Sequence, residues 1–465
     1  MAKAIALRKA AASGDPFETP CTLGDALKKG NIFTRFSCLV MGLGNIAHKQ
    51  IVKGLVFLAC EAGFFWFLFK PYGGEYWISM LPSLGSAVQE KVWNQAKGVY
   101  EYTAGDNSQL ILLYGIAALC IIAAFIVLWS MAVRSAYKAQ CLAAQGARIP
   151  TFLDDCRSLL DENVHVLLMT PPTAFLMVFT VLPLIYMMSM AFTNYSKTDN
   201  HLILFDWVGL TNFAQVLNFS SALGKQFWSV LGWTLCWAFF ATFLNFFLGT
   251  IVAMMINRKT THCKALWRAC FSMSIAVPQF VSLLCMRTML QPEGIINRML
   301  RDAGIIDASL PFFTNTTWAR VTVIVINLWI GIPYTIMQVT GILKNIPADL
   351  YDAANVDGAN TVQTFFNITL PYMLFVMTPY LITSFTGNIN NFNVIYLLSK
   401  GDPTPVGNSA GSTDLLITWL YKLSVDQQKY NIAAVIGILT FAVLALVSLI
   451  TYRNSGSYKN EEGFR

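Results

Sequence analysis

The residues best placed to do chemistry in this sequence are amides rather than acids, bases or nucleophiles. Asn388, Asn390 and Asn391 fall close together in one strongly apolar segment. An amide inside a membrane helix is costly unless it bonds another amide, a neighbouring helix or a ligand. Asn388 and Asn391 are three residues apart and therefore share a helix face. That face can bind a ligand rich in hydroxyl groups, or it can hold two helices together.

Patterns typical of enzymes are missing or incomplete. The sequence has no G-x-x-x-x-G-K-[ST] run, so we expect no ATP site in this chain. Residues 407–411 (Gly-Asn-Ser-Ala-Gly) match the serine-hydrolase pattern, but no strand precedes them and no histidine follows them. The 4 histidines form no H-E-x-x-H motif. We therefore predict no catalytic residue, no metal site and no cofactor bound by this chain.

Glu61 is the clearest ionisable residue inside an apolar segment. A carboxylate there is a functional candidate, but a single one without an obvious partner favours a helix–helix seam or a thinned region of lipid. Ion-coupled carriers place several such groups near the middle of the membrane. Any transport by this chain should therefore take its energy from elsewhere.

A second informative segment is 345–371, which we predict to fold as a helix, a turn and a second helix. Pro347 suits the first turn of a helix, and Asp349 and Asp352 suit its positive N-terminal end. Gly358 permits the sharp turn that a C-terminal cap needs.

The second short helix of this segment is expected to close at Leu370 and Pro371, before the next apolar run. Ala353 and Ala354 are small, so the groove of a partner protein could approach the backbone of the first helix closely. The pattern is typical of a helix that docks in a groove.

These residues must be positioned by membrane-spanning helices. The chain has 465 residues, of which 55% are hydrophobic and only 12% are charged, too few charges for the surface of a soluble domain. We predict an all-α, polytopic bundle. Apolar runs of about the length that crosses a bilayer lie at 51–69, 110–132, 165–192, 227–256, 267–290, 320–343, 372–398 and 430–452.

Charge sets the expected orientation of these spans. With both termini inside, most of the 32 Lys and Arg residues fall on the inner side, as the positive-inside rule requires. One outer loop is an exception to this rule, because it contains Arg287, Arg298, Arg301 and Arg320. The lysines and arginines do not form one soluble face, so we expect membrane lipid and no nucleic acid as a partner.

The chain divides by composition into successive segments. We predict a basic inner N-terminal segment (1–50), two N-terminal spans (51–132), a six-helix core (165–452) that contains the inner loop 344–371, and an inner tail (453–465).

The segment 345–371 resembles the "EAA" loop of binding-protein-dependent ABC importers, E-A-A-x-x-D-G-A followed by x-x-L-P. In that family the loop seats in a cleft of the ATPase subunit. The resemblance assigns ATPase coupling to Asp352, Ala353, Ala354, Asp357, Gly358, Ala359, Leu370 and Pro371. Asp352 stands where glutamate is usual, which keeps the charge on a shorter arm.

The resemblance extends over most of the chain, most strongly over 165–452. Residues 192–195 and 207–213 look like the region after the first core helix of sugar permeases, and 390–395 followed by 401–403 look like the corresponding region of MalF-type subunits. The two additional N-terminal spans also match the MalF type. Maltose permeases of enteric bacteria carry a large domain between spans three and four, whereas 193–226 here is a short loop.

In MalF-type permeases, two spans contact the sugar near the middle of the membrane. The resemblance places these contacts at Ile330, Gly331, Tyr334, Ser384, Gly387, Asn388 and Asn391. Amides, hydroxyls and an aromatic wall suit a sugar, and Gly331 with Pro333 should loosen the first of these helices. Gly387 replaces an aromatic residue of the maltose case, so the accepted sugar can differ.

The resemblance therefore implies one transmembrane subunit of a carbohydrate ABC importer, with a MetI/MalF-like core, in a bacterial plasma membrane. The expected substrate is an oligosaccharide such as maltodextrin. The expected partners are a second permease, an ATPase dimer that binds ATP and Mg²⁺, and an external sugar-binding protein. Two alternatives stay open: a permease for another solute, such as a polyol or glycerol phosphate, and a membrane receptor or assembly factor without transport.

Overall fold

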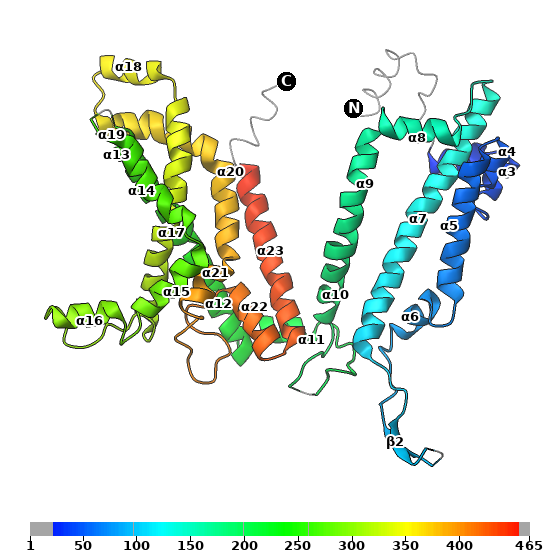
Figure 1. Ribbon diagram of the computed structural model, residues 1–465, viewed down its shortest axis with the longest axis horizontal. Helices are drawn as coiled ribbons and strands as arrows, with labels where there is room; N and C mark the ends of the chain where they lie inside the picture. The colour runs from blue at the N-terminus through cyan, green and yellow to red at the C-terminus, as the bar shows by residue number, and fades with distance from the viewer. Residues whose placement is uncertain (1–21, 96, 199, 259, 455–465) are drawn as a thin grey trace. The chain divides into compact units, whose positions relative to one another are not determined.

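The computed structural model describes residues 22–95, 97–198, 200–258 and 260–454 (Figure 1). The predicted inner tail and the first residues of the N-terminal segment therefore lie largely outside the described residues. The chain divides into two compact units, which are described separately below. The first comprises residues 1–189 and 201–207, and the second comprises 190–200 and 208–465.

The first unit is helical apart from one hairpin. Its elements are α2 (Leu23–Lys29), α3 (Ile32–Phe36), α4 (Leu43–Ala47), α5 (Ile51–Phe69), α6 (Gly74–Met80), β1 (Lys91–Asn94), β2 (Val99–Tyr102), α7 (Ser108–Ala144), α8 (Phe152–Leu160), α9 (Val164–Leu176) and α10 (Leu182–Met190). The strands β1 and β2 pair antiparallel, with Lys91 opposite Tyr102.

The short helices α2 to α4 pack against α5 and α7, and this packing gives Glu61 a partner. The main-chain N–H of Met41 donates to the Glu61 carboxylate at 2.7 Å, and Glu61 is buried. The indole N–H of Trp129 on α7 donates to the carbonyl of Cys38 at 2.9 Å. Glu61 therefore serves the seam between helices, as one carboxylate with no second acid nearby in the sequence suggested.

The second unit contains the remaining helices. They are α11 (Thr211–Leu217), α12 (Ala222–Phe239), α13 (Asn245–Asn257), α14 (Lys264–Ala276), α15 (Gln279–Met289), α16 (Ile295–Asp302), α17 (Thr316–Asn345), α18 (Ala348–Val356), α19 (Thr361–Thr364), α20 (Leu370–Ile389), α21 (Phe392–Leu398), α22 (Leu416–Tyr421) and α23 (Tyr430–Asn454). Five-residue π-helical turns join α12 to α13 and α19 to α20, so each pair forms one continuous helical run.

The core of the second unit is built around α17, which packs closely along α13. Gly249 lies against Thr335, and a Cβ at Gly249 would stand 2.6 Å from the Thr335 side chain. One apolar cluster of this unit contains Trp237, Val323 and Ile389. These close contacts fix the relative positions of the two helices.

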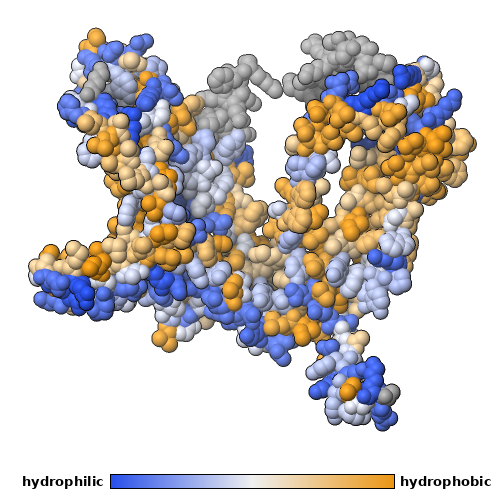
Figure 2. Space-filling view, in the orientation of Figure 1, coloured by the Kyte–Doolittle hydropathy of each residue, from blue (hydrophilic) through white to orange (hydrophobic). Residues whose placement is uncertain are grey.

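Seven helical runs in the described residues are long and apolar enough to cross a membrane, and one bent pair of helices adds an eighth candidate. Figure 2 shows hydrophobic residues along the lengths of the helices and hydrophilic residues near their ends, including α16 and α18. The predicted all-α, polytopic fold with about eight spans is confirmed.

Two predicted spans differ from the structure. The expected span 267–290 is bent by 87° between α14 and α15, because Val277 precedes Pro278 and is extended (φ −79°, ψ 126°). The expected span 372–398 ends early, at Ile389. Its last residues form the separate helix α21, which the Asn391 side chain caps by accepting from the Val394 N–H at 3.2 Å.

Candidate functional site

A small polar pocket of about 130 Å³ lies within the second unit, between the α12–α13 run, α17 and α20. Its lining residues come from three stretches far apart in the sequence, and they are Ala241, Thr242, Asn245, Phe246, Asn327, Gly331, Tyr334, Thr335, Tyr380, Ser384 and Asn388. We call this the midspan pocket, because each helical run that lines it has a candidate span length.

Asn245 is the most unusual residue of the midspan pocket. Its Nδ2 donates to the Ala241 carbonyl at 2.7 Å, but its Oδ1 has no hydrogen-bond partner among the described residues although the side chain is only 8% exposed. A buried acceptor without a donor is costly and needs an explanation. A ligand hydroxyl in the pocket would supply that donor.

Gly331 lets α17 approach this amide closely. A Cβ at Gly331 would lie 2.5 Å from the Asn245 Nδ2, closer than real contacts allow. α17 is helical throughout although Pro333 lies in its interior, so Gly331 and Pro333 do not interrupt the helix, and the loosening expected from them stays a prediction. Gly331 supplies space for the amide of a neighbouring helix.

Asn388 links α20 to the α12–α13 run. Its Nδ2 donates to the Thr242 hydroxyl at 3.0 Å, and its main-chain carbonyl accepts from the Trp237 indole at 3.1 Å. The Asn391 Nδ2 lies 3.4 Å from the Asn388 Oδ1, but the two amides do not share a helix face as predicted, because α20 ends at Ile389 and Asn391 is the N-cap of α21. Asn388 therefore joins helices and also lines the pocket.

The midspan pocket contains four of the seven sugar-site residues expected from the resemblance: Gly331, Tyr334, Ser384 and Asn388. Ile330 instead lines a neighbouring pocket with Trp329 and Ser274. Gly387 is exposed with open space around it, and Asn391 caps α21. The structure thus brings part of the predicted set together and leaves these three outside the pocket.

Sequence reasoning missed the contributions of Thr242, Asn245, Asn327, Thr335 and Tyr380. Asn245 and Asn327 are isolated amides inside apolar runs, and the rule applied to the asparagine run near 390 would also have selected them. None of the described residues that line the pocket is charged. The arrangement therefore suits a neutral, hydroxyl-bearing ligand.

The predicted docking segment has a well-defined local geometry. Gly358 follows α18 with φ +71°; its N–H donates to the Asn355 carbonyl at 3.2 Å, and the Ala359 N–H donates to the Ala354 carbonyl at 2.9 Å. This pair of bonds is a Schellman motif. The predicted turn at Gly358 is confirmed.

The eight residues assigned to coupling lie along α18, its turn and the start of α20. Within α18, Asp352 and Ala353 are exposed, whereas Ala354 is buried against the rest of the unit. Asp357 and Gly358 are exposed, Ala359 and Leu370 are half-buried, and Pro371 is exposed. The Tyr351 hydroxyl lies 3.1 Å from the Thr369 hydroxyl and ties α18 to the following helical run.

The second helix of this segment differs from the prediction. Leu370 and Pro371 do not close a short helix, because the helical run continues from α19 through α20. The π-helical turn Phe365–Thr369 precedes Pro371 and accommodates the carbonyl that a proline leaves without its usual donor. Helix α18, the predicted docking helix, is thus joined through one short turn to the helical run that lines the midspan pocket.

The residue at the centre of the hydrolase-like pattern makes structural hydrogen bonds. Ser409, the centre of the hydrolase-like pattern, donates to the Gln226 Oε1 at 2.8 Å and accepts from the Trp419 indole at 2.9 Å. Among the described residues, no group of three or more His, Cys, Asp or Glu residues could hold a metal ion.

Comparison with known proteins gives a consistent result. A family model described as "Binding-protein-dependent transport system inner membrane component" matches residues 245–456. The maltodextrin transport system permease protein MdxF of Bacillus subtilis is 33% identical over 440 residues, which is 91% of this chain and 95% of the relative. The galactooligosaccharides transport system permease protein GanP of the same organism is 31% identical, over 91% of this chain and 97% of the relative.

Two similarities that cover less of the chain agree with these. The maltose/maltodextrin transport system permease protein MalF of Escherichia coli is 34% identical over 53% of this chain and 48% of the relative. A chain from the crystal structure of a bacterial ABC transporter involved in import of the acidic polysaccharide alginate aligns with a TM-score of 0.53 at 22% identity, over 64% of this chain and 96% of that chain. This last similarity supports the fold alone.

Proposed function

Because this chain belongs to the binding-protein-dependent inner membrane permeases of ABC sugar importers, we propose that it forms part of the path for a neutral oligosaccharide of the maltodextrin class. The midspan pocket is the proposed sugar site, with Asn245, Asn388, Tyr334 and Ser384 as hydrogen-bonding groups. Residues that the resemblance suggested but that lie outside the pocket, such as Ile330, are given no sugar contact in this proposal.

The observation that carries the proposal is the connection between α18 and the midspan pocket. The N-terminal end of α18 follows α17, which supplies Gly331 and Tyr334, and its C-terminal end leads to α20, which supplies Ser384 and Asn388. A force on α18 would therefore act on both helices at once. Rigid helices that join two sites can transmit such a movement.

We propose that α18 docks in a cleft of a separate ATPase subunit. Its exposed Asp352 and Ala353 would contact that subunit, and the Gly358 turn would set the angle at which the helix leaves the membrane. Two such ATPase subunits, with bound ATP and Mg²⁺, would act on this chain and on a second permease. An external binding protein would deliver the sugar. In this proposal α18 lies on the cytoplasmic side of a bacterial plasma membrane, the side on which the sequence also predicts both termini.

The uncharged lining of the midspan pocket argues against a permease for glycerol phosphate. A glycerol phosphate would call for arginine or lysine near its phosphate, and none of the described lining residues is charged. A galacto-oligosaccharide is the second candidate substrate, because the relative GanP covers the chain as fully as MdxF does.

Reconstituted transport tests the proposal. The chain, a second permease, the ATPase and the binding protein of its transporter are placed in proteoliposomes, and ATP-dependent uptake of labelled maltodextrin and galacto-oligosaccharide is measured. Saturable maltodextrin uptake is the expected result. Uptake of galacto-oligosaccharide alone would select the second candidate, and failure of the ATPase to associate with this chain would leave a receptor or assembly role.

A further inference from the structure

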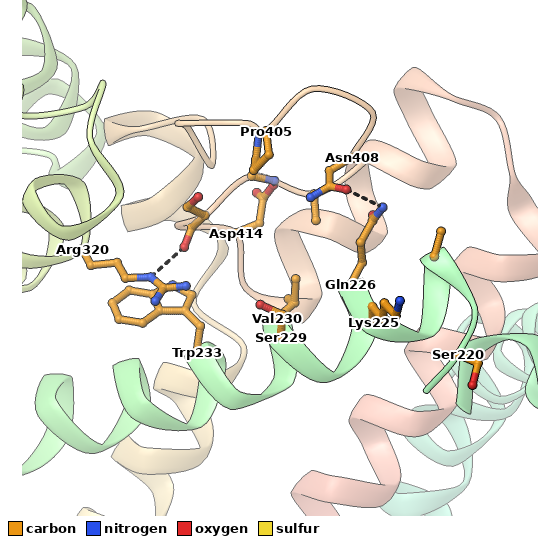
Figure 3. A pocket seen from close by; sticks show the side chains of 14 residues that line it. Ser220, Lys225, Gln226, Ser229, Val230, Trp233, Arg320, Pro405, Asn408 and Asp414 are labelled. Atoms are coloured by element: carbon orange, nitrogen blue, oxygen red, sulfur yellow. Dashed lines mark hydrogen bonds between the residues drawn. The ribbon is translucent and has the colours of Figure 1, made fainter. Parts of the chain in front are cut away.

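A larger polar cavity, of about 440 Å³, lies in the second unit at the end of α17 that is distant from α18. We call it the outer cavity. Figure 3 shows its side chains converging from the start of α12, the first turns of α17 and the loop before α22. Its lining residues are Ser220, Ala222, Lys225, Gln226, Ser229, Val230, Trp233, Arg320, Pro405, Asn408, Ala410, Gly411, Ser412 and Asp414.

Arg320 is held rigidly in the wall of the outer cavity. Its Nε donates to the Ser412 carbonyl at 3.0 Å, and its guanidinium carbon lies 4.5 Å from the centre of the Trp233 ring. The Trp233 indole in turn donates to the Thr413 carbonyl at 3.2 Å. The two terminal guanidinium nitrogens have no acceptor among the described residues, so they can bind a ligand.

The acceptors of the outer cavity are already occupied. Asp414 accepts from the Lys422 ammonium at 2.6 Å and from the Gly411 N–H at 2.7 Å. Burial raises the pKa of Asp414, and the Lys422 charge opposes that rise. The Gln226 amide is engaged with Asn408 at 3.0 Å and with Ser409. The cavity therefore offers few free acceptors.

The free groups of the outer cavity are mostly donors. They are the Arg320 terminal nitrogens, the exposed Lys225 ammonium, the Asn408 amide nitrogen and the Ser229 hydroxyl. Their complement is a ligand that presents many oxygen acceptors. Sugar units present hydroxyl, ring and glycosidic oxygens, and arginine and amide donors bind such oxygens well.

The outer cavity lies in line with the midspan pocket. On α17, Arg320 in the outer cavity is followed after seven residues by Asn327 and after four more by Gly331, both in the midspan pocket. These intervals keep one face of a helix, and at 1.5 Å per residue Arg320 and Asn327 are about 10 Å apart along the axis. One helix face thus serves both cavities.

A cluster of buried apolar side chains separates the two cavities in this structure. Trp237 is fully buried in one apolar cluster with Trp233, Val323 and Ile389, and its indole N–H donates to the Asn388 carbonyl at 3.1 Å. A sugar could pass from one cavity to the other only when Trp237 moves. The outer cavity is therefore a distinct site, and not an extension of the midspan pocket.

From this arrangement we propose that the outer cavity is a second sugar site: once Trp237 has moved aside, it binds the trailing units of an oligosaccharide whose leading units occupy the midspan pocket. The proposal rests on the proposed function and adds a preference for chain length. At about 440 Å³ the cavity falls in the range of ligand sites, whereas the midspan pocket, at about 130 Å³, is too small for a long sugar chain in this conformation.

The variant Ser229→Trp tests this site in the complete reconstituted transporter. Ser229 is exposed and donates no hydrogen bond to another described residue, so the indole fills the cavity without removing a structural contact. The measured quantity is the KM for uptake of maltoheptaose divided by the KM for maltose. We expect this ratio to rise about tenfold, because only the longer chain reaches the outer cavity.

Two further variants make the test specific. Leu231→Trp adds the same ring on the opposite face of α12 and should leave the ratio unchanged. Lys225→Ala removes one free donor without adding volume and should raise the ratio about threefold. The amount of assembled transporter is measured for each variant, so that loss of folding is distinguished from loss of the site.

Other results overturn the proposal. An equal rise of both KM values, with weaker association of the binding protein, would make the outer cavity a protein contact. An unchanged ratio in Ser229→Trp and Lys225→Ala would remove the second sugar site. Both results leave the proposed function standing, whereas absence of sugar uptake by the unmodified transporter would refute that function instead.

Discussion

The docking segment around α18 and the midspan pocket are built in opposite ways. The docking segment is continuous in sequence, and its shape comes from one helix, one left-handed glycine and one Schellman motif. The midspan pocket takes one or a few groups from each of three helical runs, and those groups meet only after the helices pack. The shape of the docking segment therefore follows from interactions between residues close in sequence. The shape of the midspan pocket depends instead on how closely the helical runs pack together.

The comparison also separates two kinds of functional defect. A change in the docking segment should alter energy coupling for every sugar alike, because no sugar reaches it. A change in the midspan pocket should alter which sugar is accepted and at what concentration, while ATPase docking persists. The following variants test that separation.

The largest effect is expected for Gly358→Val. The left-handed φ of +71° at Gly358 is strongly unfavourable for a β-branched residue, so the Schellman motif should be lost and α18 should leave its position. Uptake of all sugars is expected to fall to background, while the protein still inserts in the membrane. Uptake assays and co-purification of the ATPase measure the two consequences.

Gly358→Asn is the matched control for that variant. Asparagine tolerates the left-handed region, so uptake should stay within about threefold of the unmodified protein. Normal uptake by Gly358→Val would show that the turn has no part in coupling. A selective loss for one sugar would contradict the separation between the two regions.

The next largest effect is expected for Gly331→Ala. The added Cβ would lie 2.5 Å from the Asn245 Nδ2, and overpacking of this kind typically costs 1–3 kcal/mol. The amide must move into the pocket, so the KM for sugar should rise about tenfold. ATPase co-purification should not change.

Gly341→Ala on the same helix is the control, because a Cβ there would have no neighbour within 4 Å. It should leave KM unchanged. Equal effects of the two alanine variants would indicate that Gly331 acts through the flexibility of α17 and not through the space it leaves for Asn245.

Much of the docking segment could be predicted from sequence because its interactions are local. The turn at Gly358 follows from the position of glycine after a helix, and the Tyr351 to Thr369 contact also lies within one segment. The end of the second helix could not be predicted in the same way. A proline normally ends or kinks a helix, but here the π-helical turn before Pro371 lets the helical run continue.

The midspan pocket was only partly predictable for a different reason. Residues Gly331 and Asn388 followed from the resemblance, but the amide that Gly331 accommodates, Asn245, lies on a separate helical run. No spacing rule within one helix indicates which face of another helix will contact it. Similarly, the bend at Pro278 could be anticipated from its backbone preference, but its angle of 87° depends on packing.

A smaller effect is expected for Asn388→Ala. The variant loses the hydrogen bond to Thr242 at 3.0 Å and one amide of the pocket wall, and a neutral hydrogen bond contributes about 1 kcal/mol. The KM for sugar should therefore rise about fivefold, without loss of ATPase docking.

Asn390→Ala is the control for Asn388→Ala, since Asn390 is exposed and outside the pocket. Its KM should equal that of the unmodified protein. An equal loss of ATPase co-purification and sugar affinity in Asn388→Ala would mean that this asparagine supports the helix bundle alone.

The smallest effect is expected for Tyr351→Phe, which removes the hydroxyl that lies 3.1 Å from Thr369. Because one neutral hydrogen bond is worth about 1 kcal/mol, ATPase association should weaken by no more than about fivefold. Tyr372→Phe, which removes a longer bond of 3.4 Å to the Asn345 carbonyl, should have less effect still. Sugar selectivity should be the same in both variants, because neither hydroxyl lines the midspan pocket. A changed preference between sugars in Tyr351→Phe would mean that the orientation of α18 already shapes the pocket before ATP binds, and the two regions would then have to be treated as one site.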